Sequence, residues 1–121
     1  FGIAGYPPPV KSALEATEEE RQAIYETKWQ EGGSISYLFA YKDLLLDKSA
    51  NDTASEFVRN KIRETVNDPA TAELLCPDNH PIGTKRLILD SQYYEIFNQA
   101  NVDLVDVRSA PIQEITEKPI K

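Results

Sequence analysis

The sequence of 121 residues contains no methionine, one cysteine, one histidine and five glycines, and each scarcity excludes a kind of site. Cys76 has no second cysteine for an internal disulfide, and neither Cys76 nor His80 has a companion at metal-ligand spacing, which excludes a structural zinc site. No glycine falls in a G-x-G-x-x-G or G-x-x-x-x-G-K pattern, so the usual backbone cradle for a dinucleotide or triphosphate is missing. Because the chain begins at Phe1, we expect the natural start to lie elsewhere or to have been removed.

Long hydrophobic runs and an excess of positive charge are also missing. No apolar run reaches the roughly 20 residues that cross a bilayer, and no charged start precedes an apolar core as in a signal peptide. We therefore expect a soluble, cytoplasmic protein with no membrane partner. The 13 Lys and Arg against 20 Asp and Glu give a formal net charge of -7, which argues against a nucleic-acid partner, since such a partner requires a clustered basic surface.

With 40% apolar and 27% charged residues, the chain is long enough for one domain with a core. Pro7-Pro8-Pro9 fixes three backbone angles and predicts an extended linker over residues 1–16. Thr17 and Glu20 form a T-x-x-E capping box, and Gly32-Gly33 ends the helix that follows. The apolar side of this helix is predicted to consist of Ile24, Tyr25 and Trp29.

The next stretches predict three further helices. Residues 34–47 are almost entirely apolar or aromatic, which predicts a helix that the core, another domain or a ligand must cover. Ser49 with Asp52 is the predicted cap of the following helix, whose buried stripe is spaced by three and four residues: Ala54, Phe57, Val58, Ile62 and Val66. Asp68 and Pro69 then begin a helix that ends at Cys76-Pro77.

After a loop of turn residues, the pattern changes to alternating strand and helix. Residues 85–89 and 102–105 are predicted strands, Ser91 is the predicted cap of a short helix between them, and residues 112–116 are a possible further strand. The expected fold is thus α+β and mainly α. A helical subdomain over residues 17–82 precedes a βαβ return segment, residues 83–121, of an α/β dinucleotide-binding sheet.

Lys85 and Arg86 are two adjacent cations at the start of the first predicted strand. Such charges require either a nearby carboxylate or an anionic ligand, and the sequence leaves both open. In an open α/β sheet, ligands bind beyond the carboxyl ends of strands. Arg86 lies at the start of its predicted strand, which counts against the interpretation that it binds an anionic ligand in that crevice. His80 in the preceding loop fits either a solvated residue or a proton donor.

Several ordered segments carry a resemblance to a known family. The run from Gly83 to Val107 contains Thr84-Lys85-Arg86-Leu87, Tyr93-Tyr94, Phe97-Asn98 and Asn101-Val102, and the run from Asp47 to Val66 contains Ala50-Asn51 and Phe57-Val58-Arg59-Asn60-Lys61-Ile62-Arg63. Together these segments resemble flavin-dependent Baeyer-Villiger monooxygenases, the group that contains cyclohexanone and phenylacetone monooxygenases. The resemblance covers nearly the whole chain and is strongest from Ser34 onward.

The resemblance implies an enzyme that uses FAD and NADPH to activate O₂ as a flavin peroxide, which inserts oxygen beside the carbonyl of a small-molecule ketone and gives an ester or lactone. Arg86 matches the family's active-site arginine, which lies near both cofactors and stabilises the anionic peroxide. Lys85 matches the lysine that contacts the 2'-phosphate of NADPH. Family members line their substrate pocket near the apolar helix, which makes Tyr37, Phe39 and Tyr41 pocket candidates beside a core role.

The two glycine-rich fingerprints of the family and its F-x-G-x-x-x-H-x-x-x-W signature are absent. The resemblance therefore covers only the helical insert and the returning part of the NADP domain, and we expect activity only together with the rest of the parent chain. Two alternatives stay open: a flavin monooxygenase that oxidises nitrogen or sulfur, and a non-catalytic helical module that binds a helical partner, as the acidic charge and the apolar second helix suggest.

The missing glycine-rich cradle yields a direct prediction. The chain expressed by itself should purify colourless, because it has no motif with which to hold FAD. An absorbance spectrum of the purified chain checks this, and a flavin band at stoichiometric level would contradict it.

Overall fold

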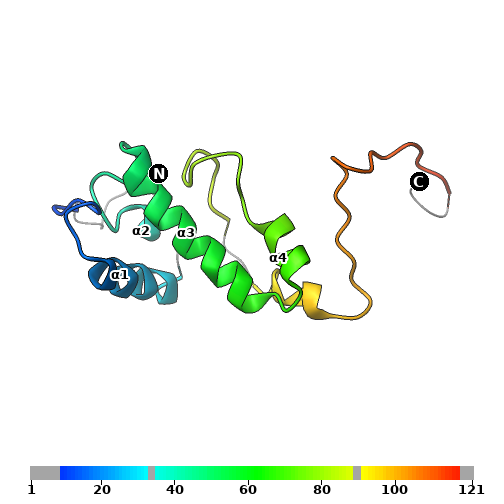
Figure 1. Cartoon of the computed structure of the whole chain (residues 1–121), viewed down its shortest axis with the longest axis horizontal. Coiled ribbons are helices and arrows are strands. Elements are labelled where there is room, and N and C mark those ends of the chain that lie inside the picture. The colour runs from blue at the N-terminus through cyan, green and yellow to red at the C-terminus, as the bar shows by residue number, and fades with distance from the viewer. Residues whose placement is uncertain (1–8, 33–34, 89–90, 118–121) are drawn as a thin grey trace.

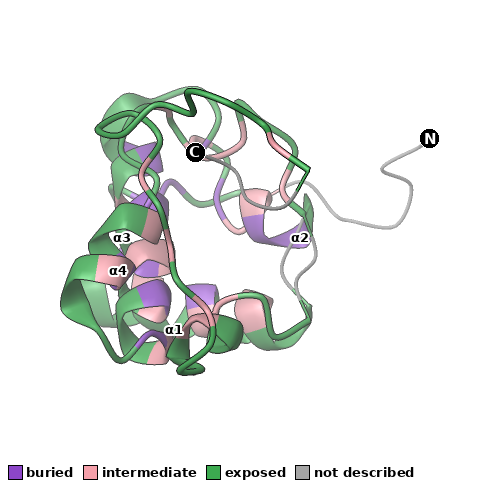
Figure 2. Ribbon diagram, turned by 90° about the vertical axis from the view of Figure 1, so that its right-hand side faces the viewer, coloured by how far each residue is buried: buried purple, intermediate pink, exposed green. Residues whose placement is uncertain are grey.

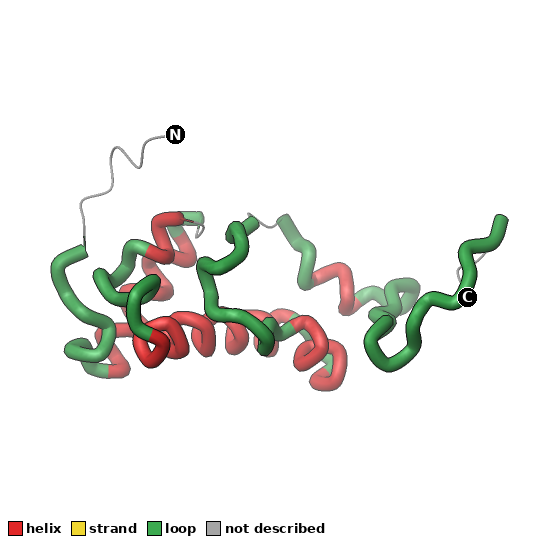
Figure 3. Tube along the Cα trace, turned by 90° about the horizontal axis from the view of Figure 1, so that it is seen from above, coloured by secondary structure: helices red, strands yellow, loops and turns green. Residues whose placement is uncertain are grey.

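The computed structural model describes residues 9–32, 35–88 and 91–117, and within these ranges the regular structure is helical (Figures 1 and 3). Four α-helices and one 3-10 helix follow in chain order: α1 Glu18–Gln30, α2 Ile35–Leu38, α3 Lys48–Thr65, α4 Pro69–Leu75 and η1 Glu95–Asn98. The long α3 crosses the centre of the molecule. Residues beyond about 100, orange to red in Figure 1, extend away from the helices.

The predicted start and end of α1 are confirmed. The Glu20 N–H donates to Thr17 Oγ1 at 3.2 Å, and the Thr17 N–H donates to the Glu20 carboxylate at 3.0 Å, which completes the capping box. The helix stops before Gly32, whose φ of 99° is the left-handed conformation that ends helices. Tyr25 is buried and Trp29 half-buried, but Ile24 is exposed, so the predicted apolar side is correct at two of its three residues.

Helix α3 confirms the predicted stripe but begins at a different cap. Ala54, Phe57, Ile62 and Val66 are buried and Val58 is half-buried. The N-cap is Asp47, whose side chain accepts a hydrogen bond from the Ala50 N–H at 3.0 Å. Ser49, the predicted cap, already lies inside the helix, where its backbone no longer has the extended conformation that a cap requires.

The predicted helix over residues 34–47 is wrong beyond its first turn. Only Ile35–Leu38 is helical among the described residues of this stretch, and turns follow. The Lys42 N–H donates to the carbonyl of Lys11 at 3.1 Å instead of to the carbonyl four residues earlier, so a contact distant in sequence replaces a helical one. Leu45 and Leu46 are consequently exposed rather than covered.

An aromatic cluster forms the main core between α1, α2, the turn after α2 and α3. The ring centroid of Tyr25 lies 5.3 Å from that of Tyr37, 5.7 Å from that of Tyr41 and 5.6 Å from that of Phe57, spacings typical of favourable aromatic pairs. Burial raises the pKa of both the Tyr25 and the Tyr37 hydroxyl. Exposed residues cover most of the outer surfaces of the helices (Figure 2).

Segment 11–16 was predicted as part of an extended linker, but it packs on this core through Asp43, and Ala13 and Ala16 are buried. The Asp43 carboxylate accepts from the Ala13 N–H at 2.9 Å and from the Ser12 hydroxyl. Partial burial alone would raise the pKa of Asp43, but these hydrogen bonds outweigh it and hold the pKa below its ordinary value.

Helix α4 and the 3-10 helix η1 form a second, smaller core with the far half of α3. Asp68 caps α4 and Pro69 occupies its first turn, as predicted. Asn98 of η1 donates to the Thr65 carbonyl at 2.7 Å and accepts from the Asn67 N–H at 2.8 Å, so one carboxamide closes the end of α3. The apolar residues of this core are Ile62, Val66, Ala72 and Cys76, with Leu75, Tyr94 and Phe97 packed against them.

The predicted βαβ segment is not formed in the described part of the chain. Residues 85–88 and 102–105 have no strand structure, Leu89 lies outside the described residues, and residue 115 makes only an isolated bridge. A strand forms by hydrogen bonding to a neighbouring strand, and the described residues supply none. The predicted short helix is a 3-10 turn without a side-chain cap, so Ser91 is not its cap.

The two possible caps of α3 can be tested against each other. Asp47→Ala should lower the free energy of unfolding by about 1 kcal/mol, since the Ala50 N–H loses its acceptor. Ser49→Ala is the matched control and should change stability by less than about 0.5 kcal/mol. Urea unfolding of both variants measures the difference, and equal effects would contradict the assignment.

The hydrogen bonds that the Asp43 carboxylate accepts from Ser12 and Ala13 should make the stability of the chain depend on pH in the acid range. A carboxyl whose pKa is depressed in the folded state contributes stability above its unfolded value, ordinarily 3.8, and that contribution is lost as the pH falls through the folded value. Asp43→Asn should therefore be less stable than the parent chain at neutral pH, and the difference should shrink below about pH 4. Urea unfolding over a pH series measures this. A constant difference would contradict the role of the ionised carboxylate.

Candidate functional site

Lys85 and Arg86 lie on a segment, residues 85–88, that lines two hollows. The larger is a cavity of about 830 Å³ and the smaller a groove of about 570 Å³, and both cations line both of them. The remaining walls of the cavity come mainly from α3, the loop after α4 and the residues around η1. Its lining residues are Trp29, Tyr37, Ser55, Val58, Pro77, His80, Ile82, Gly83, Lys85, Arg86, Leu87, Ile88, Ser91, Gln92, Tyr93, Tyr94 and Ile96.

Neither cation is neutralised by the described part of the chain. Both side chains are exposed, and neither forms a hydrogen bond or ion pair with another described residue. Most other described cations do have polar partners: Lys61 pairs with Glu26 at 2.6 Å, for example, and Arg63 with Glu73 at 2.6 Å. Of the two explanations that the sequence left open, the carboxylate partner is thus not found within these ranges. Two adjacent positive charges remain available to an anion.

The three aromatic pocket candidates are divided between the cavity and the core. Tyr37 lines the cavity and belongs to the aromatic core, where its hydroxyl donates to the Ala54 carbonyl at 2.8 Å. Tyr41 is buried in the same core, and neither Tyr41 nor Phe39 lines either hollow. Sequence reasoning did not place Tyr93 or Tyr94 at the site, although both line the cavity. The signal for them was their place among the segments that carry the family resemblance.

The other reactive side chains do not form a catalytic group. His80 lines the cavity and its Nδ1 lies 2.6 Å from Asn79 Oδ1. Cys76 is buried, burial raises the pKa of its thiol, and it is therefore a poor nucleophile. The described residues contain no group of three or more His, Cys, Asp or Glu side chains arranged to hold a metal ion.

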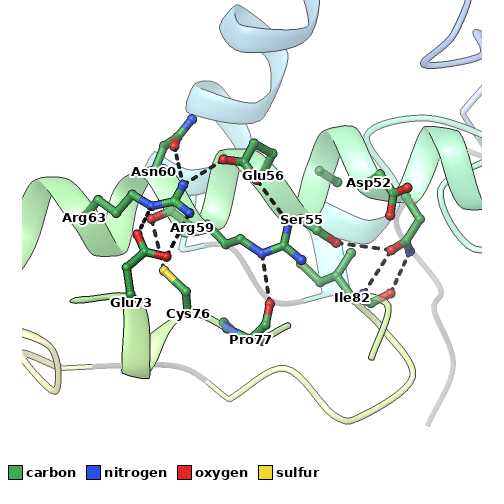
Figure 4. A network of polar contacts seen from close by, with 12 residues as sticks. Asp52, Ser55, Glu56, Arg59, Asn60, Arg63, Glu73, Cys76, Pro77 and Ile82 are labelled. Carbon is green, nitrogen blue, oxygen red and sulfur yellow. Dashed lines mark hydrogen bonds and ion pairs between the residues drawn. The ribbon is translucent and has the colours of Figure 1, made fainter. Parts of the chain in front are cut away.

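The end of α4 and the loop that leads to Lys85 and Arg86 are held against α3 by an ion pair and hydrogen bonds. Glu73 pairs with Arg63, the Pro77 carbonyl accepts from Arg59 Nε at 2.9 Å, and the backbone of Ile82 is bound near the start of the helix (Figure 4). Residues 73–82 therefore run antiparallel to α3. This arrangement delivers the two cations to the cavity at the N-terminal half of that helix.

No helix in the described ranges has the length and hydropathy needed to cross a bilayer.

Comparison with known proteins yields relatives along nearly the whole chain, although no protein-family model matches it. The chain is 47% identical over 112 residues to cyclopentanone 1,2-monooxygenase of Comamonas sp. (strain NCIMB 9872). This match covers 91% of this chain and 20% of the relative. It is 43% identical over 111 residues to 2-oxo-Delta(3)-4,5,5-trimethylcyclopentenylacetyl-CoA monooxygenase of Pseudomonas putida, with 92% and 20% covered. Phenazine N-monooxygenase PhzNO1 of Lysobacter antibioticus is 42% identical over 106 residues, with 87% and 19% covered.

Solved structures show the same likeness in three dimensions. An oxidized steroid monooxygenase bound to NADP matches with a TM-score of 0.91 and 52% identity, over 96% of this chain and 22% of that one. OTEMO in complex with FAD and NADP matches with a TM-score of 0.86 and 43% identity, over 93% and 21%. The fold is therefore that of a segment of the flavoprotein monooxygenases.

Within that class, the resemblance predicted from the sequence is confirmed: the chain is homologous to a part of the Baeyer-Villiger monooxygenases. It spans about one fifth of the length of the curated relatives that it matches.

Proposed function

We propose that this chain forms the helical insert and the returning part of the NADP domain of an FAD- and NADPH-dependent Baeyer-Villiger monooxygenase. The observation that carries the proposal is the pair of unneutralised cations on the cavity wall, at the two positions where the family resemblance places cofactor-binding residues. The overall reaction converts a ketone, O₂, NADPH and a proton into an ester or lactone, NADP⁺ and water. FAD and NADPH would supply the electrons and the activation of O₂.

The residues present fit these cofactors in different degrees. An exposed lysine and arginine without carboxylate partners suit a phosphate or another anion, which favours NADPH as a ligand of this segment. Binding of FAD would require glycine-rich segments that this sequence does not contain. In the proposed enzyme, the rest of the polypeptide would thus hold FAD, and this chain would contribute to the nicotinamide side of the site.

We assign Arg86 the role of stabilising negative charge on oxygen during oxygen transfer. A guanidinium is permanently charged and offers five N–H donors in a fixed plane, so it can bind an oxyanion without first gaining a proton. A preorganised donor of this kind contributes about 3 to 4 kcal/mol to lowering a barrier. Because Arg86 has no competing partner among the described residues, its donors are available for that task.

We assign Lys85 the contact with the 2'-phosphate of NADPH. An ammonium is a compact point charge with three donors, which suits a terminal phosphate, and NADH has no such group to bind. Tyr37 lines the cavity and is therefore the substrate-pocket candidate with the best geometric support. Phe39 and Tyr41 would reach a substrate only with other parts of the enzyme.

We further propose that residues 17–82 act as the helical subdomain, after a lead-in over residues 1–16, and that residues 83–121 take up the βαβ arrangement beside strands supplied by the rest of the polypeptide. The exposure of Ile88 and Val105 supports this, because apolar residues at such positions are buried when a strand joins an α/β sheet.

A second function, oxidation of nitrogen, is favoured by one comparison. The phenazine N-monooxygenase is 42% identical to this chain, the same identity as cyclohexanone 1,2-monooxygenase of Acinetobacter sp. A product assay of the complete enzyme with a cyclic ketone and with an aromatic amine separates the two, since only the first function yields a lactone. A purely structural helical module would instead show no effect when Lys85 or Arg86 is neutralised.

Arg86→Ala in the complete enzyme should abolish lactone formation while FAD stays bound, because the variant removes an oxyanion donor and no described structural contact. Chromatographic product analysis and the flavin spectrum measure the two quantities. Lys42→Ala is the matched control: Lys42 is also exposed, and its side chain forms no ion pair with another described residue, but it lines neither hollow. Undiminished lactone formation by Arg86→Ala would overturn the assignment.

A further inference from the structure

Asn51 is a buried polar residue of α3 that joins three parts of the chain. Its Nδ2 donates to the Leu44 carbonyl at 2.8 Å and to the Ile82 carbonyl at 2.9 Å, while its Oδ1 accepts from the Ile82 N–H at 3.0 Å and from the Ser55 hydroxyl at 3.2 Å. Both amide protons and both oxygen lone pairs are therefore used. With Ile82, the carboxamide forms the reciprocal pair of hydrogen bonds that a neighbouring strand would otherwise provide.

The residues after Ile82 turn sharply toward the cavity. Gly83 has a φ of 89°, a conformation that favours glycine, and a Cβ at this position would lie 2.7 Å from Leu45 Cδ2, so the exposed Leu45 side chain would have to move. Thr84 closes the turn, since its N–H and its hydroxyl both donate to the Pro81 carbonyl, at 3.3 and 2.7 Å. Lys85 and Arg86 follow at once.

Beyond this turn, no hydrogen bond within the described chain fixes the backbone of the two cations. Residues 85–88 form no hydrogen bond with any other described residue. The position at which the segment enters the cavity is therefore determined by the turn, and the turn is attached to α3 through Asn51.

We propose that Asn51 is a positioning residue that sets the location of Lys85, and thereby the preference for NADPH over NADH. This inference rests on the proposed function of Lys85. Asn51 touches neither cofactor nor substrate in this assignment; it acts by holding Ile82 against α3, three residues before the cation. A displacement of about 1 Å in a binding group can cost on the order of 100-fold in rate.

The test measures the ratio of kcat/KM for NADPH to kcat/KM for NADH in the complete enzyme. Lys85→Ala provides the reference, because it removes the contact itself and should lower the ratio. Asn51→Ala should lower the same ratio by about tenfold while the flavin content stays normal. Asn60→Ala is the matched control: it is an exposed asparagine of the same helix whose side chain accepts only from Arg63 among the described residues. Its ratio should equal that of the parent enzyme.

The ratio separates positioning from general loss of structure. A smaller folded fraction lowers both kcat/KM values equally and leaves their ratio unchanged. If Asn51→Ala does not fold, Gly83→Ala replaces it, since that change strains the same turn and leaves α3 intact, and the same drop is expected. An unchanged ratio in the folded variant, while Lys85→Ala lowers it, would overturn the inference. An unchanged ratio in Lys85→Ala itself would instead overturn the role proposed for Lys85.

Discussion

Helix α3 is the element to which the other described helices are bound. Tyr25 of α1 bonds to Thr53 at 2.7 Å, and Tyr37 of α2 bonds to the Ala54 carbonyl. At the other half of the helix, α4 is joined through Glu73 and η1 through Asn98. Every other described helix is thus bound to α3. The cavity depends on α3 as well, because the loop after α4 runs back along this helix and the two together line the cavity.

The parts of this fold that local chemistry determines were predictable from the sequence. The T-x-x-E box, the Asp68-Pro69 start and the buried stripe of α3 each involve residues within a few positions of one another, so their meaning does not depend on the rest of the chain. The N-cap of α3 shows the limit of this reasoning. Asp47, Ser49 and Asp52 are all chemically able to cap, and only the backbone conformation at Asp47 distinguishes it.

The predictions that failed concern contacts distant in sequence. The turn region after α2 is apolar enough for a helix. The hydrogen bonds from the Lys42 N–H to the Lys11 carbonyl and from the Ala13 N–H to the Asp43 carboxylate hold it in another conformation. The predicted strands are absent from the described ranges because a strand is defined by its neighbour. The sequence did place Lys85 and Arg86 beside each other, and the resemblance suggested a role for them. The cavity that they share with Tyr37 and Tyr94 could be seen only in three dimensions.

The choice of an amide to hold the turn before these cations has an electrostatic consequence. A carboxylate at position 51 could accept the Ile82 N–H, but it would face the carbonyls of Leu44 and Ile82 without a donor. Its charge would lie buried against Ile82, which is three residues before Lys85. The asparagine satisfies all four of its hydrogen-bonding positions and adds no charge. In a chain with a net charge of -7, most of the described cations form ion pairs with carboxylates on the surface. The neutral Asn51 side chain fixes the backbone of Ile82, and the full positive charge of Lys85 and Arg86 stays available to an anionic ligand.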